Sequence, residues 1–110
     1  MKVTPDKYVT YRYAGASGDF NPIHIDEEFA RAVGLPGRIL HGLWTMAQVA
    51  RAQSDDPLAL RSLSVHFRGL GVPEHEITIV SEPGEDGVVQ CEAIQDGNRL
   101  VRRGRAVLRI

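Results

Sequence analysis

The sequence predicts an α+β protein in which helices come first and an antiparallel sheet follows. Before residue 54 the apolar residues recur at helical spacing between capping residues, whereas from residue 61 onward they alternate with polar residues. The segment from His41 to Gln53 links the two halves, because it has almost no polar face and a helix of that kind is buried. We therefore expect this helix to lie across the sheet.

Local signals place two further helices before it. Thr4-Pro5-Asp6 supplies a capping hydroxyl, a proline for the first helical position and an acid for the first turn. The first helix is therefore predicted to run from there to about Ala16 and to end near Gly18. Asp26 is the predicted N-cap of a short second helix, which Gly34 ends.

The second half predicts four strands joined as an antiparallel meander. Its last two connections contain the turn segments Glu82–Gly87 and Asp96–Asn98, which are typical of hairpins. Cys91 alternates inward with its apolar neighbours and is expected in the core. The apolar positions that define the strands lie in four segments: Leu63–Phe67, Ile77–Ile79, Val89–Ala93 and Leu100–Ile110.

Composition limits the classes of protein that fit. A chain of 110 residues is expected to form one domain, residues 1–110, and its net charge of −1 does not suggest a nucleic-acid partner. The single cysteine excludes an internal disulfide framework and fits a reducing cytoplasm. No apolar run reaches the roughly 18 residues of a membrane span, and the N-terminus lacks a signal-peptide core. Because so small a chain buries a limited core, we expect a dimer.

Residues 17–26 form a loop by their chemistry and carry an acid, Asp19, and an imidazole, His24. The buried helix then opens with Gly42, where unpaired backbone N–H groups face outward and the absent side chain permits close approach. An acid, a base and an amide-lined anion site are the parts needed for proton transfer beside a carbonyl.

Each of these residues also has a plainer interpretation. Asp19 could cap a turn, and His24 could be a core histidine bonded to backbone. Asn21 is divided between a turn and a site residue, whereas Asp26 fits an N-cap and His41 fits a structural role. The complete loop followed by the helix start favours catalysis for Asp19 and His24.

The segments Tyr13–Asp26 and His41–Met46 resemble the MaoC-like family. These are (R)-specific enoyl-CoA hydratases and 3-hydroxyacyl thioester dehydratases of the hot-dog fold, in which an antiparallel sheet wraps around a central helix. The chain is also similar to the small dehydratase subunits of actinobacterial fatty-acid elongation. The resemblance implies reversible hydration of trans-2-enoyl thioesters to (R)-3-hydroxyacyl thioesters. It implies no cofactor, since CoA or phosphopantetheine arrives with the substrate.

The resemblance also assigns roles to residues. It implies that Asp19 and His24 are the acid/base pair and that the Gly42 N–H forms the oxyanion hole. It also implies that Asn21, in the same loop, is a substrate-binding residue. Ala50 stands where some relatives carry a serine. The family uses no metal, although Asp19, His24, Asp26 and His41 are of metal-ligating types. From their place on the buried helix, three residues are predicted to wall the acyl chain: Leu43, Trp44 and Met46.

Other questions stay open at this stage. Relatives begin with a strand of about a dozen residues, comparable to a strand with its turn, so here the sheet is expected to lack a strand or to receive one from a partner. The substrate is an acyl-CoA or acyl-carrier-protein thioester, and the assembly a homodimer or a heterodimer with another hot-dog subunit. The alternatives are an acyl-thioester-binding subunit that needs such a partner, and a thioesterase. A cluster of arginines marks either a solvated sheet edge or a phosphate site: Arg99, Arg102, Arg103, Arg105 and Arg109.

Overall fold

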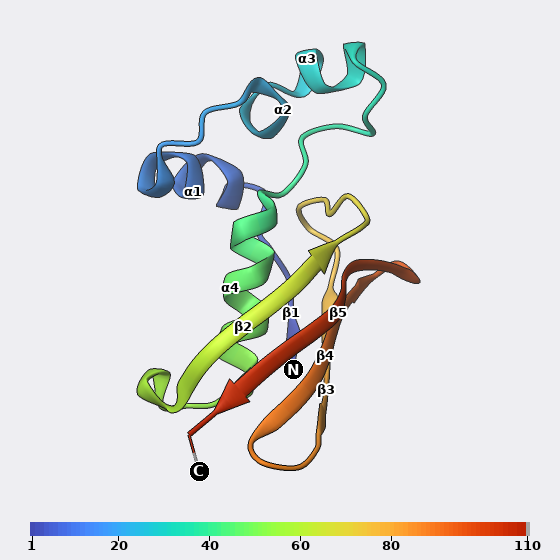
Figure 1. Ribbon diagram of the computed structural model, residues 1–110. Helices are drawn as coiled ribbons and strands as arrows, with labels where there is room; N and C mark the ends of the chain where they lie inside the picture. The colour runs from blue at the N-terminus through green and yellow to red at the C-terminus, as the bar shows by residue number, and fades with distance from the viewer. Residues whose placement is uncertain (110) are drawn as a thin grey trace.

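The computed structural model describes residues 1–109 and contains one five-stranded sheet with four α-helices (Figure 1). The predicted last strand extends to Ile110, which lies outside the described residues. The elements in chain order are β1 (Lys2–Val3), α1 (Val9–Ser17), α2 (Pro22–Ile25), α3 (Glu27–Ala32), α4 (Gly42–Gln53), a 3-10 turn (Pro57–Ala59), β2 (Leu60–Phe67), β3 (Ile77–Pro83), β4 (Val88–Gln95) and β5 (Asn98–Leu108).

The sheet is antiparallel throughout, with strand order β1-β3-β4-β5-β2. The hairpins β3–β4 and β4–β5 are confirmed. Asp96 and Gly97 close the second hairpin, with φ of 51° and 77°, the geometry of a two-residue hairpin turn. The simple four-strand meander is wrong, because β2 pairs with β5 and not with β3. The long connection 68–76 carries the chain across to the other side of the sheet.

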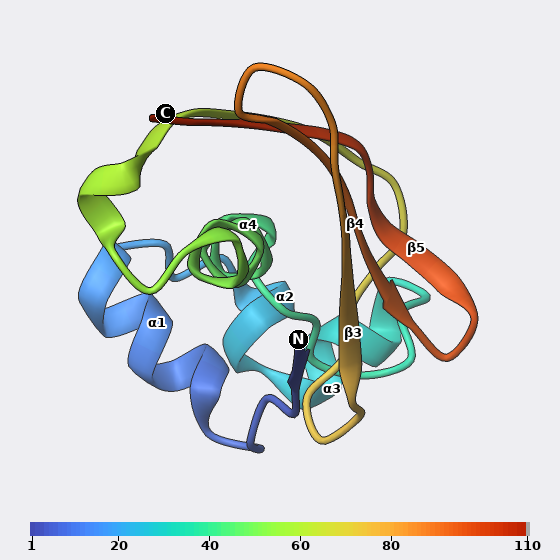
Figure 2. The same ribbon diagram turned by 90° about the horizontal axis from the view of Figure 1, so that it is seen from below.

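Helix α4 lies against β2, β3, β4 and β5, as expected for an apolar helix across a sheet. Figure 2 views α4 nearly end-on, with the sheet curving along one side of it and α1 along another. The core beneath it includes Val49 of the helix, which is completely buried, and Cys91 of β4. The prediction that this helix is buried on all sides is wrong, however. Leu43 is 60% exposed, and Ala47 and Arg51 continue an exposed face, since one open sheet covers only one side of a helix.

The N-terminus differs from prediction in two ways. A first strand is present: Lys2 and Val3 pair with Thr78 and Ile77 of β3, so the expectation of a missing strand is wrong. The first helix starts at Val9 and not near Thr4, because the preceding residues are drawn along the sheet edge.

Asp6, predicted as an acid of the first helical turn, lies in a turn that precedes α1. Its carboxylate accepts the N–H of Tyr8 at 2.7 Å and binds the guanidinium of Arg12. The hydrogen bond from Arg12 lowers the pKa of the Asp6 carboxyl.

The remaining helix boundaries follow the local signals. Gly18 ends α1 with φ of 81° and donates its N–H to Ala14, and Gly34 follows α3 with φ of 92°. The Asp26 carboxylate accepts the N–H of Phe29 at 3.0 Å and thereby caps α3. None of the helices in residues 1–109 is long and apolar enough to cross a membrane.

Two of the clustered arginines are used by neighbours on the surface. Arg99 Nε binds the Glu92 carboxylate at 2.5 Å, and Arg109 Nε donates to the carbonyl of Leu58 at 2.8 Å. For these two, the interpretation as a solvated, charged sheet edge fits the contacts better than a phosphate site does.

Candidate active site

The segment between α1 and α3 is not simply a loop, because α2 forms within it. Asn21 is the N-cap of α2 and accepts the N–H of Ile23 at 3.2 Å, while Pro22 occupies the first helical position. This single turn directs His24 inward, where only 7% of its surface remains exposed. The side chain of Asn21 therefore caps a turn, which is the plainer of its two interpretations.

His24 is held in one orientation by the backbone. Its Nδ1 lies 2.8 Å from the carbonyl oxygen of Ile39. A carbonyl oxygen only accepts, so Nδ1 carries the hydrogen and Nε2 of the neutral ring keeps its lone pair. Nε2 in turn lies 3.8 Å from Oδ2 of Asp19. The free lone pair of His24 therefore faces the carboxylate.

Asp19 presents one carboxylate oxygen to its own backbone and the other to His24. Oδ1 accepts the N–H of Asn21 at 3.2 Å, so Asp19 does cap a turn. The separation between Oδ2 and His24 Nε2 is too long for a direct hydrogen bond but suits two groups that share a water. The carboxylate side chain is 52% exposed, so water reaches this point from outside.

His41, interpreted from sequence as structural, lies within the same cluster. Its ring stacks on the ring of His24, with centroids 3.8 Å apart and planes 19° from parallel. The metal-ligating atoms of Asp19, His24 and His41 all lie within 4.8 Å of one another, whereas Asp26 is outside this group. Lone pairs of imidazoles lie in the ring planes, so two nearly parallel stacked rings do not aim them at one ion in this arrangement.

A cavity of about 240 Å³ opens beside His24 and the first turn of α4. Two of the predicted catalytic residues, His24 and Gly42, thus share one cavity, whereas Asp19 is not among the residues that line it. Thr45 and Phe67 also line it and were missed from sequence. Thr45 had a local signal, since it follows Gly42 by three residues and lies on the same helix face; Phe67 comes from β2 and had none. The lining residues are His24, Ile39, Leu40, Gly42, Thr45, Phe67, Arg68, Gly69, Leu70, Gly71 and Leu100.

The three predicted acyl-chain residues are not among those that line this cavity. Leu43 points outward with 60% of its surface exposed, and Met46 is partly buried elsewhere on the helix. Trp44 lines a shallow hollow against α1 and packs on the core. Leu43, Trp44 and Met46 lie on α4 with Gly42 but on other faces of the helix. Thr45, three residues after Gly42, lies on the face that lines the cavity.

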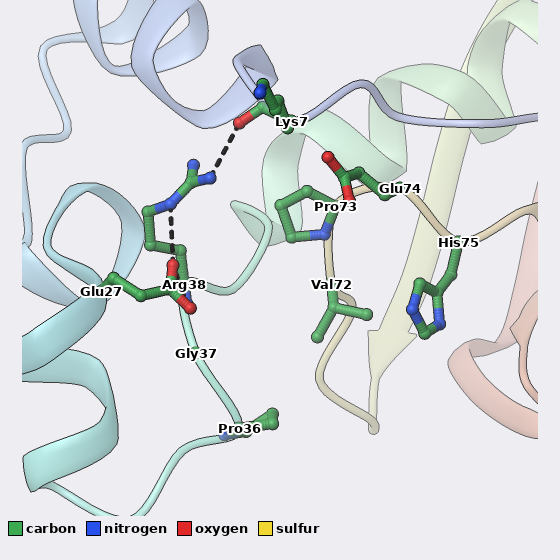
Figure 3. Close-up of a pocket in the computed structure, with 9 residues that line it drawn as sticks. All are labelled: Lys7, Glu27, Pro36, Gly37, Arg38, Val72, Pro73, Glu74 and His75. Atoms are coloured by element: carbon green, nitrogen blue, oxygen red, sulfur yellow. Dashed lines mark hydrogen bonds and ion pairs between the residues drawn. The ribbon is translucent and has the colours of Figure 1, made fainter.

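A second cavity, of about 360 Å³, lies between Arg38 with its neighbours and residues 72–75 of the β2–β3 connection (Figure 3). Its arginine is occupied within the chain: Nε binds Glu27 at 3.0 Å, Nη1 donates to Thr10 and Nη2 donates to the carbonyl of Lys7. These bonds tie α1, α3 and the segment before α4 together. The guanidinium of Arg38 beside this cavity is therefore already bonded within the chain and has a structural role.

Comparison with known families decides which family shares this arrangement. Residues 1–100 match the family described as MaoC like domain. The chain belongs to the MaoC-like family. The expected fold is confirmed with it, an antiparallel sheet around a helix in the hot-dog manner.

This MaoC-like domain has relatives named as hydratases. It is 36% identical over 110 residues to the enoyl-CoA hydratase ChsH3 of Mycobacterium tuberculosis, covering 94% of the domain's chain and 37% of the relative. It is 31% identical over 115 residues to the peroxisomal enoyl-CoA hydratase 2 of Arabidopsis thaliana, covering 98% of the chain and 36% of the relative. The chain thus spans between one third and two fifths of these relatives.

Solved structures repeat the same architecture. A MaoC-like dehydratase from Phytophthora capsici superposes with a TM-score of 0.92 at 28% identity, covering 99% of this chain and 40% of that one. The ChsH1–ChsH2 complex from Mycobacterium tuberculosis includes a chain with the same fold, with a TM-score of 0.78 at 19% identity, covering 99% of this chain and 92% of that one.

Proposed function

We propose that the domain carries a site for reversible hydration of trans-2-enoyl thioesters to (R)-3-hydroxyacyl thioesters. One observation carries the proposal: His24 Nε2, with its lone pair free, lies 3.8 Å from Asp19 Oδ2 and lines the same cavity as Gly42. The names of the hydratase relatives support the same reaction class.

Asp19 and His24 act on one water molecule. A water oxygen placed to one side of the two atoms can lie about 2.8 Å from each, because Nε2 and Oδ2 are 3.8 Å apart. One of the pair takes a proton as the water oxygen bonds to the β carbon, and the π electrons of the alkene move toward the thioester oxygen. The proton taken from water is then delivered to the α carbon from the same side, as the electrons of the enolate form the new C–H bond. Because both groups stand on one face of the substrate, addition is syn, and dehydration runs through the same steps in reverse.

Gly42 stabilises the charge that develops on the thioester oxygen. As the first residue of α4 it presents a backbone N–H that has no acceptor within the helix, at the positive end of the helix dipole. A donor of this kind is worth about 3–4 kcal/mol at the barrier. A side chain at this position would place its Cβ 3.2 Å from the Phe67 ring, so glycine keeps the approach open.

The acyl chain occupies the apolar part of the same cavity. Its walls are Ile39, Leu40 and Leu100 inside, with Phe67 and Leu70 at the rim, 48% and 55% exposed. The thioester arrives on CoA or on the phosphopantetheine of an acyl carrier protein, so the reaction needs no separate cofactor.

The domain works in a pair with a second hot-dog domain, either a copy of itself or another subunit. The exposed face of α4 formed by Leu43, Ala47 and Arg51 supports this, since it leaves apolar surface uncovered on the element next to the site. A binding subunit that depends on its partner for turnover is the second candidate on the same observation. Measuring the molecular mass and the hydratase activity of the purified chain separates the two candidates. A stable, active homodimer argues against the binding subunit, whereas a chain without activity on its own supports it.

Loss of the enoyl-thioester absorbance of crotonyl-CoA tests the reaction. We expect turnover by the wild-type protein and a loss of at least about 100-fold in kcat for Asp19→Asn and for His24→Ala, in line with removal of a positioned acid or base. His66→Ala, at an exposed position of β2, is the matched histidine control and retains activity. No turnover on enoyl thioesters of any chain length, or full activity in both variants, contradicts the proposal.

A further inference from the structure

His41 is the most enclosed member of the site cluster and has no role in the reaction described above. It is 2% exposed and is the N-cap residue of α4, directly before Gly42. The centroid of its ring lies 3.8 Å from that of His24 and 4.8 Å from that of Tyr13, and the planes of the His41 and Tyr13 rings are tilted by 57°. One side chain thus contacts α1, the turn that carries His24, and the start of α4.

The hydrogen bond of His41 reaches the other member of the acid/base pair. Its Nε2 lies 3.0 Å from the backbone carbonyl oxygen of Asp19. Since that oxygen only accepts, Nε2 is the donor and Nδ1 of the neutral ring carries the lone pair. The bond anchors the Asp19 backbone at a point where the side chain is half exposed and its carboxylate is otherwise held by one local N–H.

The other ring nitrogen marks His41 as more than a structural residue. Nδ1 is buried and has no hydrogen-bond partner among the described residues. Buried polar atoms are nearly always paired, because an unpaired one lowers stability. A phenyl ring could also stack on His24 and would leave no buried nitrogen unpaired. Stacking alone therefore does not explain an imidazole at this position.

We propose that His41 is a positioning residue for the acid/base pair, an inference that rests on the proposed function. The face of the His41 ring stacks on the His24 imidazole and fixes the plane of that ring. The Ile39 carbonyl binds His24 Nδ1 and fixes the rotation of the ring within the plane. The Nε2–H of His41 sets the distance of Asp19 from that imidazole. His41 itself neither touches the substrate nor exchanges a proton with it.

Kinetics of three variants test the role of the Nε2 donor. His41→Phe keeps the stacked ring and removes the donor, and we expect kcat for crotonyl-CoA to fall at least about 10-fold, since small misplacements of catalytic groups have large effects on rate. KM stays within about threefold, and Tm stays within about 4 °C, the shift that about 1 kcal/mol produces in a domain of this size. His41→Gln places an amide N–H near the position of Nε2 and recovers part of kcat, whereas His41→Asn, whose amide is near Nδ1, does not.

The backbone provides a readout that does not depend on turnover. The carbonyl ¹³C signal of Asp19 should shift in His41→Phe and return toward its wild-type value in His41→Gln. If wild type does not hydrate enoyl thioesters, the proposed function fails, while an Asp19 signal that responds in this order still supports the positioning. A kcat within twofold of wild type in His41→Phe, equal kcat in the Phe and Gln variants, or an unmoved Asp19 signal overturns the inference.

Discussion

Gln95 is a buried polar residue that fastens the β2–β3 connection, and its replacement by leucine gives a direct measure of that link. The side chain is 3% exposed at the end of β4. Its Oε1 accepts the N–H of Val72 at 2.9 Å, and its Nε2 donates to the carbonyls of Val72 and His75 at 2.8 and 2.9 Å. The same connection accepts the N–H of Leu40 through the carbonyl of Gly71, at the edge of the cavity of the candidate active site.

The expected cost of Gln95→Leu follows from these bonds. Three hydrogen bonds are lost at about 1 kcal/mol each, and three partly buried backbone groups are left without partners. The leucine side chain returns about 1 kcal/mol through its added apolar burial. We therefore expect a loss of at least about 2 kcal/mol in the free energy of unfolding, since the unpaired backbone groups add to the cost of the lost bonds. With a urea m-value of about 2 kcal/mol/M, the unfolding midpoint falls by at least about 1 M.

Urea unfolding followed by the fluorescence of the single tryptophan, Trp44, measures this shift. Gln90→Leu is the matched control, because it makes the same change at an exposed position of the same strand. We expect its midpoint to stay within the equivalent of about 0.5 kcal/mol of wild type. If Gln95→Leu shifts the midpoint no further than Gln90→Leu, the three bonds do not stabilise the fold and the reasoning is refuted.

Three further predictions concern the core and α1. In Gly104→Ala the new Cβ would lie 2.5 Å from the carbonyl oxygen of Cys91, so the strands must separate, and calorimetry should show a loss of about 1–3 kcal/mol. Gly15→Ala meets no atom within 4 Å on a helix and should gain about 0.5–1 kcal/mol; equal effects in the two variants would contradict the contact-based argument. Burial raises the pKa of the Cys91 thiol, so a thiol reagent at pH 8 should modify it slowly in the folded protein and quickly in urea, and fast labelling of the folded protein would be inconsistent with this burial.

Much of the site could be predicted because its signals are local. Gly18 in its left-handed conformation, Asp26 as an N-cap and Gly42 at a helix start each depend on residues within one turn of chain. The pairing of Asp19 with His24 is also short-range, since five positions separate them. The loop prediction failed only where Asn21 and Pro22 start a helical turn that was not expected.

The lining of the cavity could not be predicted in the same way. Leu43 and Trp44 are the next two residues after Gly42, yet successive helix residues point about 100° apart, and these two face away from His24. Phe67 comes from a strand and reaches the site only because β2 pairs with β5.

Local sequence patterns predict the class of fold, the position of α4 and the two hairpins, because periodicity, capping and turn residues act between neighbouring residues. The acid, base and glycine of the candidate site are predicted from the chemistry of one loop and one helix start, together with the resemblance to the MaoC-like family. Only the tertiary structure decided the short strand β1, the placement of β2 beside β5, the exposed face of α4 and the stacking of His41 on His24. These depend on contacts between segments far apart in the chain, whose free energy no local pattern encodes.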